Sequence, residues 1–280
     1  NINHAQRING EKNKIVMTLT PEQIQSNWNQ LLKYIDQFIS EPRKEKLLDF
    51  YKKYEERIML MPAAHKKEYH NSFPGGYVEH VNRVVRCAVK QYELWRIEGA
   101  DMSTFDIEEL VFSAINHDLG KMGDENEESY IPQTDQWRRD KLGEDYMFNT
   151  KVPFASVPDR GLFMLQSHGI QYTFNEMVAI QTHDGLYDEA NTKYLKAYLP
   201  EQKPRTCLPF ILHQADLMAA RIEFEREWLP KLKEGKKNLA NTKKNFTLGT
   251  KPNSSKKLST KVKALGSIKS DGLKNMLDNL

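Results

Sequence analysis

The sequence has few cysteines and no long apolar run, and both absences limit what this 280-residue chain can be. Its two cysteines, Cys87 and Cys207, cannot build a disulfide framework, which is typical of a reducing cytosol. No apolar run approaches the roughly 20 residues that span a bilayer, so we expect no membrane contact. Residues 1–16 are polar and charged, unlike a signal peptide. These absences predict a cytoplasmic protein.

The sequence also lacks a methionine at its start, whereas Met17 directly precedes a strong helix start. We therefore interpret residues 1–16 as a disordered arm, an upstream extension or a tag, and leave them out of the expected fold.

Acidic residues are scarce at the C-terminal end. Residues 231–280 contain 13 Lys and only three acidic residues, Glu234, Asp271 and Asp278. The whole chain has a net charge of +3, so the preceding residues form an acidic body. The Lys-, Asn-, Ser- and Thr-rich composition of this segment is typical of a flexible tail. Such a tail either improves solubility or makes non-specific, salt-dependent contact with nucleic acid.

Helical signals run through the acidic body and predict an all-α fold. Thr20-Pro21-Glu22-Gln23 combines an N-cap hydroxyl, a first-turn proline and a Gln three residues after the cap, so a helix should begin here. An apolar stripe of helical period follows the turn Pro74-Gly75-Gly76. Thr173 and Glu176 form a second capping box, for a helix that ends near His183. We expect further helices over 43–60, over 106–117 and from Pro209 onward.

Residues 120–160 are polar and rich in turn-forming residues, which predicts a long loop with a short hairpin at Tyr146 to Val152. The expected organisation is a pair of N-terminal helices within 17–60, packed on a core domain over 61–230, with the tail 231–280 after it.

Four residues stand out as candidate metal ligands because they are polar groups in apolar helices. His80 lies near the start of one helix, His117 and Asp118 close another, and Asp216 interrupts the apolar run 210–220. Burying such groups is costly unless they are paired or ligated. Imidazole and carboxylate together suit Mn, Fe, Ni or Zn.

Three segments resemble the motifs of HD-domain metal-dependent phosphohydrolases. The first is His70-Asn71-Ser72-Phe73-Pro74-Gly75-Gly76-Tyr77-Val78-Glu79-His80, which is similar to the branch with a Pro-Gly-Gly turn before the first ligand histidine, as in YhaM-type exoribonucleases. The second is Ile115-Asn116-His117-Asp118-Leu119-Gly120-Lys121, which resembles the central motif. The third is Ile180-Gln181-Thr182-His183-Asp184-Gly185. The resemblance covers roughly residues 60–225.

This resemblance implies an HD-type helical bundle that binds one or two divalent transition metal ions (Mn, Fe, Ni, Co or Zn). The implied first site consists of His80, His117, Asp118 and Asp216. Asp118 would bridge to a second ion, for which His183 is a ligand and His168 its possible partner. His168 departs from this pattern, since it lies on a loop before the Thr173 cap.

The implied reaction is hydrolysis of a phosphoester in a nucleotide or nucleic acid by metal-activated water. Asp118 and Lys121 are the predicted catalytic residues, with Lys121 as the phosphate contact. Lysine is also favoured at a helix C-terminus for electrostatic reasons alone. Further candidates for substrate contact are Arg83, His70 and Arg221, and Asp184 could orient a water molecule or a ligand histidine.

Two other functions are compatible with the same residues. A few members of the superfamily are di-iron oxygenases that use this ligand set, which would require both metal sites. The third possibility is a non-catalytic module that keeps the fold and senses a nucleotide.

Overall fold

The structure, a computed structural model, describes residues 19–66 and 69–246. Its contacts divide the chain into two units, 1–233 and 234–280. The described residues form ten α-helices, one two-stranded sheet and short 3-10 turns, which confirms the all-α class. The helices are α1 (Pro21–Phe38), α2 (Arg43–Lys53), α3 (Glu55–Leu60), α4 (Gly76–Ile97), α5 (Ile107–Asn116), α6 (Gln136–Leu142), α7 (Val157–Ser167), α8 (Phe174–Thr182), α9 (Thr192–Leu195) and α10 (Leu208–Phe246). The 3-10 turns are η1 (Met102–Thr104), η2 (Leu119–Met122), η3 (Gly185–Tyr187), η4 (Glu189–Asn191) and η5 (Pro200–Gln202).

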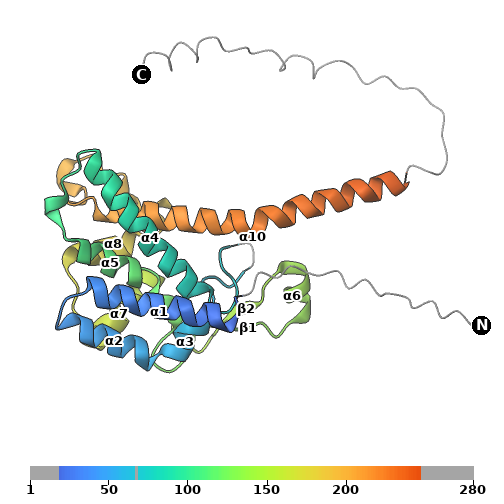
Figure 1. Cartoon of the computed structure of the whole chain (residues 1–280), viewed down its shortest axis with the longest axis horizontal. Coiled ribbons are helices and arrows are strands. Elements are labelled where there is room, and N and C mark those ends of the chain that lie inside the picture. Colours follow the sequence, from blue (N-terminus) through green and yellow to red (C-terminus); the bar gives the residue numbers. More distant parts are fainter. Residues whose placement is uncertain (1–18, 67–68, 247–280) are drawn as a thin grey trace, which may run out of the picture. The chain divides into compact units, whose positions relative to one another are not determined.

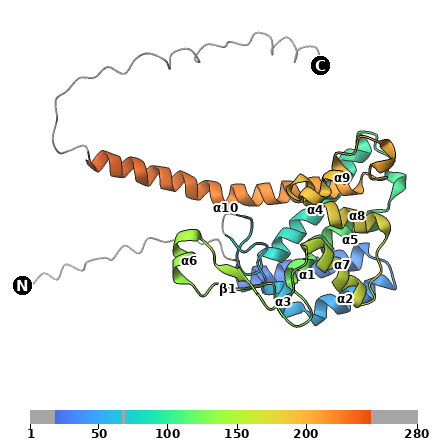
Figure 2. The same ribbon diagram turned by 180° about the vertical axis from the view of Figure 1, so that it is seen from behind.

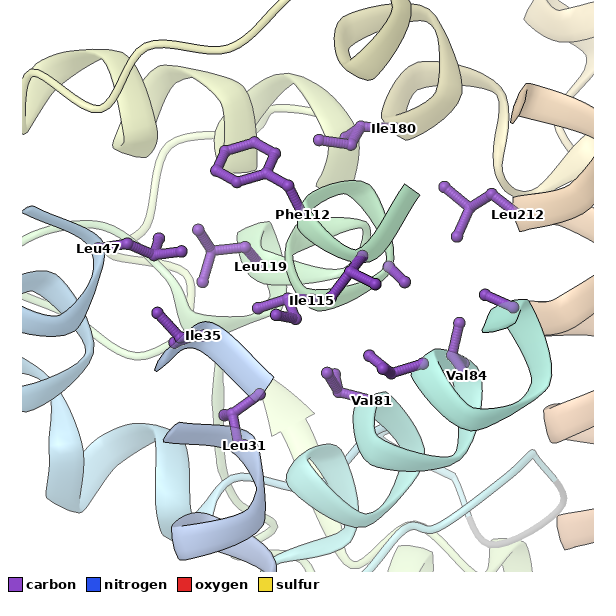
Figure 3. Packing of buried hydrophobic residues seen from close by; sticks show 14 of the residues in the cluster. Leu31, Ile35, Leu47, Val81, Val84, Phe112, Ile115, Leu119, Ile180 and Leu212 are labelled. Atoms are coloured by element: carbon purple, nitrogen blue, oxygen red, sulfur yellow. The ribbon is translucent and has the colours of Figure 1, made fainter. Parts of the chain in front are cut away.

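Helix α5 lies at the centre of the first unit. It packs against α1, α4 and α8, and these helices lie side by side in both ribbon views (Figures 1 and 2). Figure 3 shows Phe112 and Ile115 of α5 among buried side chains from α1, α2, α4, α8 and α10. Because α5 is surrounded, its C-terminal end lies inside the protein, and the two residues that follow it, His117 and Asp118, are buried.

The predicted helix starts are confirmed. Thr20 and Gln23 exchange the two hydrogen bonds of a capping box at the start of α1, and Thr173 and Glu176 do the same for α8. Helix α4 begins directly after Gly75, whose φ of 81° is a left-handed conformation that glycine adopts readily. These local signals set where α1, α4 and α8 begin.

The single helix expected over 43–60 is instead two helices, α2 and α3, separated at Tyr54. Tyr54 leaves the helical region with φ −109° and ψ 20°. Its buried ring packs against Phe50, with 5.1 Å between centroids, and against His168, with 5.7 Å. This tertiary packing around Tyr54 was not visible in the local helical pattern.

The expectation for residues 120–160 was wrong in two respects. Strand β2 (Tyr146–Phe148) does not form a local hairpin up to Val152, but pairs antiparallel with β1 (Tyr130–Pro132), and α6 lies between the strands. Helix α7 already begins at Val157, where the Ser156 hydroxyl accepts a hydrogen bond from the backbone N–H of Asp159. The two strands are remote from each other in sequence, and the Ser156 cap lies in a polar stretch. The composition of this region therefore predicted neither the strand pairing nor the start of α7.

Helix α10 continues through residues 231–246, part of the segment expected to be a flexible tail. Its Lys, Leu, Glu and Ala residues are good helix formers. The prediction of a flexible tail rested on charge and composition and did not include this helix propensity. Residues 247–280, and the arm 1–16, lie outside the described residues. No helix in the described ranges has both the length and the apolar character needed to cross a bilayer.

Candidate metal centre

Four separate segments bring the predicted ligands together in the first unit. His80 comes from the first turns of α4, His117 and Asp118 follow α5, His183 follows α8, and Asp216 lies in α10. The three histidines are buried, and Asp118 is only 4% exposed. Residues more than 130 positions apart therefore meet in one cluster.

The three histidines are oriented in the same way, with Nδ1 bound to a partner outside the cluster and Nε2 facing its carboxylates. Nδ1 of His117 lies 2.8 Å from the carbonyl oxygen of Ala114, and Nδ1 of His183 lies 2.7 Å from that of Ile180. Nδ1 of His80 lies 3.0 Å from Oε2 of buried Glu223. An imidazole that donates from Nδ1 presents its Nε2 lone pair to a metal, and such outer partners are usual for metal-binding histidines.

The carboxylates of Asp118 and Asp216 face these Nε2 atoms. Oδ2 of Asp118 lies 3.5 Å from Nε2 of His117 and 3.7 Å from that of His80. The other oxygen, Oδ1, lies 3.4 Å from Nε2 of His183. Oδ1 of Asp216 is 3.2 Å from Nε2 of His80. Asp118 therefore presents one oxygen to each side of the cluster, as a carboxylate that bridges two ions would.

Several ring nitrogens in the cluster lack hydrogen-bond partners. Nε2 of His70, His80 and His117 is buried without one among the described residues. The 3.2 Å contact between His80 and Asp216 is an ion-pair distance without hydrogen-bond geometry. A buried polar atom left unpaired costs about 1–3 kcal/mol. A cation at this position would remove that cost at several nitrogens at once, so the donor set fits a metal ion.

The carboxylates of the cluster favour protonated imidazoles. Burial by itself lowers the pKa of His80, but Glu223 and Asp216 outweigh it and raise this pKa to about 10. Burial also opposes charge on His183, yet Asp118 and Asp184 raise its pKa to about 9. Burial disfavours the charged form of Asp118, but the Lys121 ammonium and His117 hold its pKa well below the usual range. The cluster therefore stores positive charge next to its carboxylates.

Overlapping groups of these residues have ligand atoms within 4.8 Å of one another. The groups are His70, His80 and Asp118; His80, His117 and Asp216; His117, Asp118 and His183; and His183, Asp184 and Asp216. With Nδ1 engaged, each imidazole of His80, His117 and His183 has one lone pair for one ion, whereas a carboxylate can bridge. A first ion can therefore take His80 and His117, and a second can take His183 and Asp184, with the two other aspartates between them.

Asp184 was expected only to orient a water molecule or a histidine, but it lies within ligand distance of the cluster. Its Oδ2 is 3.7 Å from Nε2 of His183. A repeated pattern could have revealed it: α5 and α8 each end in His-Asp followed by a 3-10 turn, at His117-Asp118 and His183-Asp184. His70 was expected to contact substrate, and it too lies within ligand distance of the cluster.

The structure does not bring His168 to the cluster, so its expected role as a second-site ligand is corrected. His168 caps the C-terminus of α7 and packs edge-on against Phe50, with 4.9 Å between ring centroids. Both ring nitrogens have other partners: Nδ1 lies 2.9 Å from the carbonyl oxygen of Met164, and Nε2 lies 3.2 Å from Nζ of Lys53. His168 belongs to the packing between α7 and the helices α2 and α3.

The predicted substrate-contacting cations lie in different environments. Nζ of Lys121 lies 2.5 Å from Oδ2 of Asp118. Arg221 lines the pocket next to the cluster, and its Nε donates to Glu225 at 2.9 Å. Arg83 does not line this pocket, and its guanidinium bonds Glu223 at 2.9 Å and Glu79 at 3.0 Å. The expected role of Arg83 as a substrate contact is therefore corrected. Arg83 instead holds Glu223 in place behind His80.

A pocket of about 570 Å³ opens next to the cluster. His70, Lys121, Asp184 and Asp216 line it on the cluster side. Much of the remaining wall is aromatic, and consists of His65, Tyr69, Tyr130, Phe148, Tyr187 and Phe224. The ring centroids of His65 and Phe148 are 4.6 Å apart, so part of this wall is a packed aromatic group. The pocket combines a charged floor with a flat, apolar wall.

No protein family, curated protein or solved structure matches the chain.

Proposed function

We propose that this protein is a metal-dependent phosphohydrolase of the HD type, which hydrolyses a phosphoester in a nucleotide or nucleic acid. The observation that supports this most is the convergence of four segments on one cluster of imidazoles and carboxylates, with Lys121 beside it at the floor of a pocket. The motifs around His80, His117 and His183, which resemble those of the HD superfamily, contribute three histidines of that cluster.

His80, His117, Asp118 and Asp216 would hold the first ion, and His183, Asp184 and Asp216 a second one, to which Asp118 could also contribute an oxygen. A bound divalent ion lowers the pKa of water toward neutrality and polarises a phosphoryl oxygen. The Lys121 ammonium, 2.5 Å from Asp118, lines the pocket and would stabilise negative charge on the phosphoryl group. Glu223 and the backbone carbonyls of Ala114 and Ile180 fix the histidine rings.

The aromatic wall supports a substrate with a flat ring, as in a nucleotide. Aromatic side chains stack on nucleobases with little sequence preference, and a stacked base contributes about 1–3 kcal/mol. Tyr130 and Phe148 of the sheet and Tyr187 of η3 line the pocket that also contains Lys121. One molecule could thus place its phosphate at the cluster and its base against this wall.

The test is a screen of nucleotides, cyclic nucleotides and short oligonucleotides with Mn²⁺, Co²⁺, Ni²⁺, Fe²⁺ or Zn²⁺. We expect release of phosphate or of a shortened oligonucleotide, abolished in Asp118→Ala and retained in Asp159→Ala, a surface aspartate in the first turn of α7. If none of these phosphoesters is cleaved with any of the five metals, the hydrolase proposal fails.

Two results would favour the alternatives. Bound iron with an optical signal that responds to oxygen would favour a di-iron oxygenase, for which the group His183, Asp184 and Asp216 offers a second site. A cellular effect that persists in Asp118→Ala would favour a nucleotide-sensing module. Non-specific nucleic-acid contact through the Lys-rich tail is a separate proposal, and a salt-dependent affinity lost on removal of residues 247–280 would support it.

A further inference from the structure

His70 lies in the cluster without any role in the first or second ion site described above. It sits on the segment between α3 and α4, ten residues before His80. Its ring centroid is 4.4 Å from that of His80, and a ring nitrogen lies within 4.8 Å of ligand atoms of His80 and Asp118. Nε2 of His70 is buried and has no hydrogen-bond partner among the described residues. A buried, unpaired imidazole nitrogen that close to two ligands needs an explanation.

The backbone next to His70 is held tightly in place. The carbonyl oxygen of Asn71 accepts hydrogen bonds from the backbone N–H of Ala63 at 3.1 Å and of Phe73 at 2.9 Å. The side-chain amide of Asn71 donates to the carbonyl oxygen of Gly76 at 3.2 Å. Asn71 has a φ of 46°, a left-handed conformation that asparagine tolerates better than most residues.

Gly76 also fixes the backbone position of Asn71. A Cβ atom at Gly76 would lie 2.0 Å from the carbonyl oxygen of Asn71, so only glycine permits this approach. The segment that carries His70 is thus anchored to the first residue of α4, the same helix that carries His80. A ligand position requires such a fixed backbone beneath its side chain.

We propose that His70 is a further protein ligand of the first ion, which binds through Nε2 together with His80, His117, Asp118 and Asp216. The group of His70, His80 and Asp118 and the group of His80, His117 and Asp216 share His80, whose Nε2 can serve only one ion because its Nδ1 is engaged by Glu223. Both groups therefore describe the same ion. This inference rests on the metal centre of the proposed function, but it does not depend on which reaction the centre performs.

The consequence is a first site with three imidazoles and two carboxylates, of which His70 is on the pocket side. Three nitrogen ligands favour a transition metal over Mg²⁺ or Ca²⁺, which prefer oxygen ligands. Because His70 also lines the pocket, its side chain would stand next to a substrate bound there.

The test measures metal binding without any substrate. Metal-free protein is titrated with Co²⁺ against a chelating indicator, for wild type, His70→Ala and His65→Ala. His65 is the matched control, because it lines the same pocket but belongs to none of the groups with ligand spacing. Loss of an outer partner of a ligand histidine weakens metal binding by about 10- to 100-fold. Because His70→Ala removes a ligand itself, we expect it to weaken binding of the more tightly bound Co²⁺ ion by at least this factor. His65→Ala should bind Co²⁺ as the wild type does.

Wild-type affinity in His70→Ala would overturn the inference, even if hydrolysis were lost, and would assign His70 to substrate. If His70→Ala does not fold, the test is made on the wild-type protein by NMR. The ¹⁵N resonance of His70 Nε2 should shift when Zn²⁺ binds, and a resonance that does not move would overturn the proposal. A protein that binds metal through His70 but cleaves no phosphoester would contradict the proposed function and leave this inference intact.

Discussion

The ammonium of Lys121 lies 2.5 Å from Oδ2 of Asp118, the oxygen that also faces Nε2 of His117 at 3.5 Å. Burial disfavours the charge on Lys121, but Asp118 outweighs it and raises the pKa of the ammonium. Lys121 therefore remains charged, and it neutralises the same carboxylate oxygen that a metal ion would bind.

Replacing Lys121 should thus affect binding and catalysis in opposite directions. In Lys121→Met, Asp118 loses its cation in the metal-free protein, so metal affinity should rise by about tenfold, the equivalent of one charge-assisted hydrogen bond. Hydrolysis should fall by about 100-fold or more if the ammonium stabilises the phosphoryl group. Isothermal titration and turnover measurements check both, with Lys151→Met, a lysine paired with Glu127 at 3.0 Å, as control. A parallel fall in both quantities would contradict the assignment.

Metal binding should release protons. The pKa of His80 is about 10 and that of His183 about 9 in the metal-free protein, so both are protonated at pH 7. A metal binds only the neutral imidazole. We expect release of about two protons when both sites fill at pH 7, and an apparent affinity that rises with pH up to about 10, the higher of the two pKa values. Titrations at pH 7 in buffers of different ionisation enthalpy count the protons. A heat independent of the buffer would rule this out.

Glu223 should act on the metal through His80. Its Oε2 lies 3.0 Å from Nδ1 of His80, and its Oε1 accepts from Nε of Arg83 at 2.9 Å. Glu223→Gln should weaken metal binding by about 10- to 100-fold, as is usual for outer partners of a ligand histidine. Glu225→Gln, which removes only an exposed pair with Arg221, should leave the affinity unchanged. Equal affinities in the two variants would show that Glu223 does not support the site.

The second ion should depend on His183 and not on His168. His183→Ala should reduce the number of ions bound per chain, measured by mass spectrometry of the metals, because it removes an imidazole 3.4 Å from Oδ1 of Asp118. His168→Ala should keep the wild-type stoichiometry, and should lower the melting temperature through lost packing with Phe50. One bound ion in the wild type itself would limit the centre to the first site.

Local signals in the sequence predicted the helices that carry the site. The capping boxes at Thr20 and Thr173 each use groups three residues apart, so neighbouring residues determine them. His80, His117, Asp118 and Asp216 were predicted as ligands because each is a polar residue in an apolar helix, and His183 because its motif resembles that of the HD superfamily. Such residues need compensation wherever the helices pack.

The sequence did not reveal what depends on packing between remote segments. The pairing of β1 with β2 spans an intervening helix, and the position of His168 against Phe50 is set by how α7 meets α2. Arg83 has the charge expected of a phosphate contact, but only the structure shows Glu223, 140 positions away, bound to its guanidinium. His70 was visible as a residue near the site, yet its unpaired nitrogen was not.

The small sheet contributes to the wall of the pocket but not to the candidate metal ligands. Tyr130 and Phe148 come from β1 and β2 and contribute to the pocket wall, whereas the ligand groups contain no residue of either strand. Substitutions in the sheet can therefore change which molecule fits the pocket while the chemical groups stay in place. Phe148, which is 58% exposed, is one position of the wall where a substitution would change the pocket and leave the candidate ligands untouched.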